Sequence, residues 1–144
     1  MIRRSFLALL AGASILAAPL QSRADDTHSK AAEPVTISHG SKVQIADYLV
    51  PGKTTVVDFY SEHCPTCKAL YPGVKKLHAT RGDIAVVFVD IDRPGSKGID
   101  WDSPVSKQYD VPSTGTPLFK VYGPDGRLQV ERKQGYTLVT RWLN

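Results

Sequence analysis

Residues 54–67, TTVVDFYSEHCPTC, pass from a β-branched and aromatic run into two cysteines that are separated by two residues. The run from Thr54 to Tyr60 has the composition of a strand that is buried on both faces of a sheet. After three loop residues, Cys64 stands at the start of a helical pattern with a period of 3.6 that extends to about Thr80. This stretch therefore predicts a strand, a short loop and a helix that begins at the first cysteine.

The segments on either side continue the alternation of strands and helices. Outward from this stretch, the sequence predicts a strand at 35–38, a helical or turn-like segment at 43–50, a strand at 84–89, a helix from Ser103-Pro104 to about 109, strands at 117–122 and 128–131 joined by a turn, and a terminal helix that includes 138–143. The last two strands favour an antiparallel hairpin. The order as a whole indicates an α/β fold with three layers, α/β/α, around a mixed central sheet.

The first 24 residues have the layout of a secretory signal peptide. A basic head with Arg3 and Arg4 precedes an uncharged run from Phe6 to Leu20, and the small residues Ser22 and Ala24 stand three and one positions before an expected cleavage site. The two arginines also resemble a twin-arginine export motif. Either route takes the protein out of the cytoplasm, so we expect a periplasmic or secreted location.

Removing that leader changes what the composition implies. The chain has 144 residues and a net charge of +4, and three basic residues but no acidic residue lie in positions 1–24, so the remainder carries +1. Positions 25–34 are expected to form a flexible polar lead-in, and 35–144 suit one small domain. A charge near zero argues against nucleic acid as a partner. No apolar run reaches the roughly 20 residues of a membrane-spanning helix, so stable membrane insertion is not expected.

The placement of the two cysteines favours redox chemistry. A sulfur atom at the start of a helix faces unpaired backbone N–H groups and the positive end of the helix dipole, which stabilise a thiolate. Cys64 is therefore the expected nucleophile. Cys67, one turn later, is close enough to form a disulfide with Cys64 and to resolve a mixed disulfide. Pro65 suits the first turn because its missing N–H would be unpaired there.

Two other interpretations of the cysteines stay open. A structural zinc site needs about four ligands, and the four histidines that could join the cysteines show no repeated spacing. An inert structural disulfide is common in exported proteins, although a bridge across two residues closes so small a loop that it restricts the unfolded chain little. We expect neither a metal ion nor an organic cofactor.

A carboxyl group and a proline are the other unusual features. Asp58 interrupts the buried run, and burying an unpaired carboxylate costs so much free energy that such a group usually takes up a proton. It is a candidate to exchange a proton with Cys67; otherwise it lies at a strand edge and reaches solvent or a lysine. Pro117 begins a strand, where a proline lies at an edge or marks a tight turn, sometimes with a cis bond.

Together these motifs resemble the thioredoxin family. The shared features are the strand VVDFY, the pair CPTC followed by Lys68, the proline Pro72 five residues after Cys67, and Gly115-Thr116-Pro117 before a strand and a hairpin. The similarity covers about Val35 to Leu143. It implies the thioredoxin fold and a thiol:disulfide oxidoreductase that acts on disulfide-containing protein clients.

The resemblance also implies roles for particular residues. Cys64 would be exposed, Cys67 buried, and Asp58 an internal proton carrier. Pro117 would be cis beside the cysteines, where the backbone of Thr116 pairs with an extended client segment as an added strand.

The residues around the first cysteine depart from the family pattern. Thioredoxins usually carry Trp-Cys-Gly-Pro-Cys, whereas here His63 replaces the tryptophan and Pro65-Thr66 replaces Gly-Pro. These three residues would form the client-binding rim. Because the dipeptide between the cysteines tunes the reduction potential, strongly reducing character does not follow from the resemblance.

Two further departures lie elsewhere in the chain. Phe88 replaces the lysine that thioredoxins place near the buried aspartate, and the loop 93–102 is longer than expected. The Pro-Thr pair and the PDGRL hairpin are also similar to thioredoxin-like proteins of cytochrome c maturation, which normally carry a larger insertion than this chain.

We therefore expect an exported thiol:disulfide oxidoreductase that acts as a reductase. A membrane-embedded thiol reductant or another redox partner would restore its dithiol, because an oxidising compartment makes that step necessary. A disulfide oxidase or isomerase runs the same chemistry in reverse. A non-catalytic module that binds clients or metal is an alternative of another class. We expect the protein to be a monomer.

Overall fold

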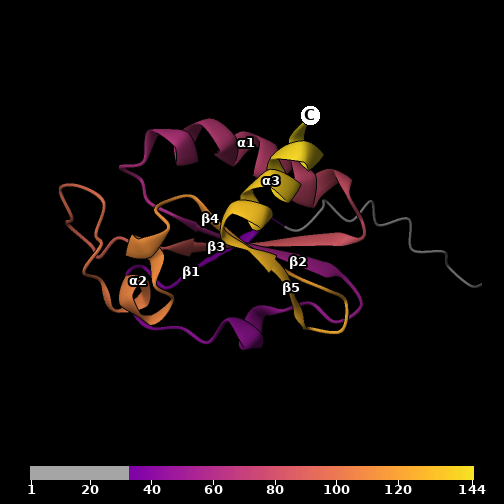
Figure 1. Ribbon diagram of the computed structural model, residues 1–144, viewed down its shortest axis with the longest axis horizontal. Helices are drawn as coiled ribbons and strands as arrows, with labels where there is room; N and C mark the ends of the chain where they lie inside the picture. The colour runs from indigo at the N-terminus through magenta and orange to yellow at the C-terminus, as the bar shows by residue number, and fades with distance from the viewer. Residues whose placement is uncertain (1–32) are drawn as a thin grey trace, which may run out of the picture.

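A mixed sheet of five strands forms the middle of the domain (Figure 1). This computed structural model describes residues 33–144, so the predicted signal peptide and most of the lead-in lie outside the described residues. The strands are β1 (Val35–Ile37), β2 (Thr54–Tyr60), β3 (Ile84–Asp90), β4 (Leu118–Tyr122) and β5 (Leu128–Glu131). Their order is β1-β3-β2-β4-β5. The first three run parallel, β4 pairs antiparallel with β2, and β5 pairs antiparallel with β4.

Helices cover both faces of this sheet, which confirms the three predicted layers. They are α1 (Pro65–Thr80), α2 (Pro104–Gln108) and α3 (Arg132–Leu143), with 3-10 turns at Ile45–Tyr48 and Val111–Ser113. Figure 1 shows α1 and α3 together above the sheet and α2 below it. The lower layer is thin, because α2 has only five residues and the rest of that layer consists of turns.

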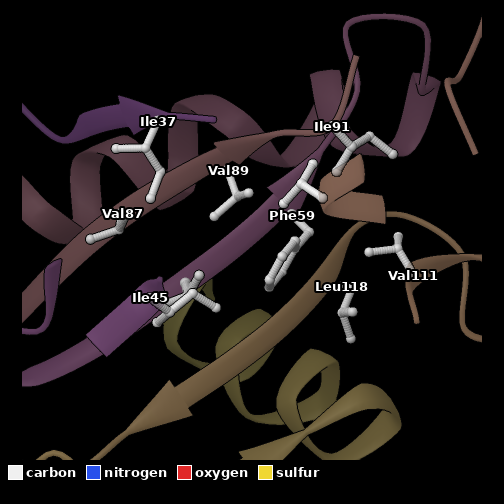
Figure 2. Close-up of a cluster of buried hydrophobic side chains, with 10 residues drawn as sticks. Ile37, Ile45, Phe59, Val87, Val89, Ile91, Val111 and Leu118 are labelled. Carbon is white, nitrogen blue, oxygen red and sulfur yellow. The ribbon is translucent and has the colours of Figure 1, made fainter. Parts of the chain in front are cut away.

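The strand β2 is buried on both faces, as its composition predicts. Phe59 faces the thin layer, in the cluster of Figure 2, and pairs with Val89 of β3 and Leu118 of β4. Val56 faces the other way, among side chains of α1 and α3. Since side chains alternate along a strand, Asp58 belongs to the same face as Val56. The central strand thereby places a carboxyl group among apolar side chains.

The helix starts follow local sequence signals. The Oγ of Ser103 accepts a hydrogen bond of 3.3 Å from the N–H of Ser106, and Pro104 occupies the first position of α2, as the sequence predicts. The terminal helix is longer than its apolar pattern indicates, since α3 begins at Arg132, directly after β5.

Gly135 accounts for this early start, because it lets the first turn of α3 lie against β4. A Cβ atom at this position would lie 2.3 Å from the carbonyl oxygen of Phe119. We expect Gly135→Ala to lower the free energy of unfolding by about 3 kcal/mol or more, as measured by urea denaturation. In the control, Gly82→Ala, no atom lies within 4 Å of the added Cβ, and the change should stay within about 1 kcal/mol. Equal stability of the two variants would contradict the close packing.

Candidate active site

Cys64 and Cys67 form a disulfide at the start of α1, with Cα atoms 5.3 Å apart. Cys64 is the N-cap residue, and its Sγ accepts a hydrogen bond of 3.1 Å from the backbone N–H of Cys67. That N–H has no partner within the helix, so it is free to stabilise negative charge on the sulfur. Pro65 occupies the first helical position.

Both cysteines are buried in the disulfide form. Cys64 is 3% exposed and Cys67 is 4% exposed, so the expectation of an exposed Cys64 is wrong for this form. The reason is the chain segment before β4: the Sγ of Cys64 lies 3.5 Å from the carbonyl oxygen of Thr116. The peptide bond between Thr116 and Pro117 is cis, as the resemblance implies, and Pro117 is buried.

The predicted rim residues lie on the surface around this pair. Pro65 and Thr66 are exposed on the first turn of α1. His63 is exposed too, and its Nε2 lies 3.1 Å from the carbonyl oxygen of Ser96, so its ring faces the long loop after β3. A pocket of about 450 Å³ adjoins the disulfide on the side of α1; its lining consists of Tyr60, Ser61, Glu62, His63, Cys67, Lys68 and Tyr71.

Asp58 is the buried carboxyl group of the domain's central strand. It is 2% exposed and pairs across the sheet with Phe88 of β3 and Phe119 of β4, so the alternative of a solvent-reaching edge position is wrong. Its Oδ1 has no hydrogen-bond partner among residues 33–144. Burial raises the pKa of Asp58 from 3.8 to about 8, because the charged form loses its hydration. The group can therefore gain or lose a proton near neutral pH.

A buried hydrogen-bond network fixes the loop that leads to Cys64, and the sequence analysis did not identify it. The Oδ2 of Asp92 accepts hydrogen bonds from the Oγ of Ser61 (2.7 Å) and the N–H of Glu62 (3.0 Å). The Oγ of Ser61 accepts one from the N–H of His63 (3.0 Å), and its carbonyl oxygen accepts one from the N–H of Cys64 (3.1 Å). Each backbone N–H from 62 to 64 is therefore paired. The available signal was a second aspartate two residues after the end of β3.

The described part of the chain shows neither a metal-binding cluster nor a helix suited to a membrane. Within residues 33–144, no group of three or more histidine, cysteine, aspartate or glutamate side chains is arranged to hold a metal ion. In the same range, none of the helices combines the length and the apolar character that crossing a bilayer requires.

A central strand, a short fixed loop and a disulfide at a helix start together define a thiol:disulfide oxidoreductase. The chain belongs to the thioredoxin family, whose model matches residues 39–137. A thioredoxin from Mycoplasmoides gallisepticum is 29% identical over 79 residues, which are 55% of this chain and 71% of that protein.

Solved thioredoxin structures share the fold at low sequence identity. The thioredoxin of Trypanosoma brucei brucei has a TM-score of 0.54 at 15% identity, over 79% of this chain and 91% of its own. That of Malassezia sympodialis has a TM-score of 0.51 at 17% identity, over 83% of this chain and 99% of its own. At these identities the likeness concerns the fold alone.

Proposed function

We propose that this thiol:disulfide oxidoreductase is an exported reductase of protein disulfides. The observation that carries the proposal is the position of the Cys64 Sγ between the N–H of Cys67 and the backbone of Thr116. One neighbour stabilises a thiolate, and the other offers a backbone edge to a polypeptide. Support for export comes from the sequence, whose first 24 residues have the layout of a cleavable signal peptide.

The first chemical step uses the reduced form. The thiolate of Cys64 attacks one sulfur of a client disulfide, so that the client S–S bond breaks, a mixed disulfide forms, and the other client sulfur leaves as a thiolate. Backbone pairing with Thr116 would hold the client segment extended beside the sulfur. The exposed residues Pro65, Thr66 and His63 would contact the client side chains.

The second step returns the enzyme to its disulfide form. Cys67 loses its proton and attacks the Cys64 sulfur of the mixed disulfide, which releases the second client thiolate and leaves the client reduced by two electrons. Asp58, with a pKa of about 8, would accept that proton when it is ionised. A membrane-embedded thiol reductant, or another redox partner, would then supply two electrons to reduce the disulfide between Cys64 and Cys67.

The direction of electron flow is set by the reduction potential of the pair. A reductase requires a potential more negative than that of glutaredoxins, which have about −200 to −230 mV. We expect equilibration with glutathione buffers, followed by thiol labelling, to give such a value. A potential of about −120 mV would instead identify a disulfide donor, and an intermediate value would favour an isomerase.

A further inference from the structure

The side chain of Arg132, the first residue of α3, connects this helix to a segment that precedes Thr116 and β4. Its Nη1 donates hydrogen bonds to the Oγ of Ser113 (2.8 Å) and the Oγ1 of Thr114 (2.5 Å). Its Nη2 donates to the Oδ2 of Asp110 at 3.1 Å. One guanidinium group thus holds three side chains of a five-residue segment, 110–114, that lies about 20 residues earlier in the chain.

Both residues of the ion pair in this contact have a left-handed backbone conformation. Asp110 has φ 53° and Arg132 has φ 56°, a conformation that non-glycine residues adopt at a cost. The ion pair between them is partly exposed, with side chains 65% and 44% accessible, and such pairs contribute little to stability. The contact therefore offsets little of its own conformational cost, and its main effect is on the geometry of the neighbouring segment.

The held segment leads directly to Thr116. The N–H groups of Thr114 and Gly115 both donate to the carbonyl oxygen of Val111, at 3.0 and 2.8 Å, which closes the 3-10 turn. Gly115 follows in the left-handed region, with φ 85°. The next carbonyl group is that of Thr116, 3.5 Å from the Sγ of Cys64. A displacement of the turn would therefore be expected to shift the backbone that faces the nucleophile.

We propose that Arg132 is a positioning residue for protein clients: it holds segment 110–114, and through it the backbone of Thr116, in register with an extended client strand. The inference rests on the proposed function, because it assumes that clients pair with Thr116. It separates two kinds of substrate. A polypeptide disulfide needs the held backbone edge, whereas a small disulfide without peptide groups needs only the thiolate of Cys64.

The main test variant is Arg132→Gly, because glycine adopts a positive φ without cost and the fold should tolerate the change. Arg132→Lys keeps the charge but lacks the planar fork of the guanidinium group. Arg81→Ala is the matched control. Arg81 pairs with Asp83 far from the site in sequence, and the accessibilities of 44% and 65% are the same as those of the Arg132 pair.

Reduced wild type and variants are mixed with insulin or with bis(2-hydroxyethyl) disulfide, and the rate of each reaction is followed. We expect Arg132→Gly to lower the rate constant for insulin about fivefold, through loss of segment ordering, and to leave the rate for the small disulfide unchanged. Arg132→Lys should recover part of the loss. The pKa of the Cys64 thiol, followed by thiolate absorbance, should not change. A general structural defect would alter this pKa.

Several results would overturn the inference. Arg132→Gly could react with insulin at the wild-type rate, or lose activity equally on both substrates, or behave like Arg81→Ala. Failure of the proposed function is distinguishable, because wild type itself would then reduce the small disulfide but not insulin.

Discussion

Replacing Cys64 with serine is expected to lower the rate of insulin reduction by at least about a thousandfold. The serine hydroxyl stays protonated where the cysteine forms a thiolate, so no mixed disulfide can form. The helix start would still present the N–H of Cys67, which lies 3.1 Å from the Sγ of Cys64 in the wild type. In the variant, however, this N–H would have no thiolate to stabilise. The measurement is the initial rate of insulin reduction with dithiothreitol as the electron source.

The matched control is Cys67→Ser, which also lacks the disulfide but keeps the nucleophile. It should carry out the first step and stop there, so it should accumulate mixed disulfides with insulin, visible on non-reducing gels. In extracts, the same variant should capture the natural clients through Cys64. If Cys64→Ser kept substantial insulin-reducing activity, Cys64 would not be the nucleophile, and the mechanism proposed above would be wrong.

Asp58→Asn is expected to stabilise the oxidised protein by an amount that grows with pH. The pKa of Asp58 is raised from 3.8 to about 8 in the folded protein, so between these values the folded state keeps a proton that the unfolded chain has lost. Wild-type stability therefore decreases from about pH 4 to about pH 8 and then levels off. Asparagine does not titrate. The free energy of unfolding of Asp58→Asn should exceed that of the wild type by little near pH 4 and by on the order of 5 kcal/mol above pH 8.

Urea denaturation of the oxidised proteins at a series of pH values measures this difference. The control Asp47→Asn changes an exposed carboxyl group and should follow wild type throughout the series. A stability difference between Asp58→Asn and wild type that did not vary with pH would show that the carboxyl group is solvated. The same variant should also resolve mixed disulfides more slowly than wild type, since Cys67 would lose its proton acceptor.

Much of the fold could be predicted because its signals are local. The composition of β2 reports burial on both faces, and Ser103-Pro104 carries its own capping chemistry. The start of α3 could not be predicted in this way. It depends on the close approach of Gly135 to the backbone of Phe119, and that approach exists only once β4 and α3 are packed together.

The same distinction between local signals and contacts made only in the folded chain applies to the candidate site. Cys64, Cys67 and Asp58 stand out in the sequence because their residue types are unusual in their local setting. The burial of Cys64 and the network around Asp92 involve partners from other parts of the chain, Thr116 and Ser61. The contact between Arg132 and Asp110 spans 22 residues. A lone arginine in a polar segment gives no sign of such a contact before the fold is known.

The unequal layers of the domain have a consequence for its dynamics. The cysteines lie at the start of α1, a helix of 16 residues packed against the sheet together with α3, whereas segment 110–114 belongs to the thin layer of short turns. Local opening costs least where few regular hydrogen bonds must break. Amide hydrogens of the thin layer should therefore exchange with solvent sooner than those of α1 and β2. The protein would thereby combine a rigid redox centre with a recognition segment whose order depends on a few side-chain contacts, such as those of Arg132.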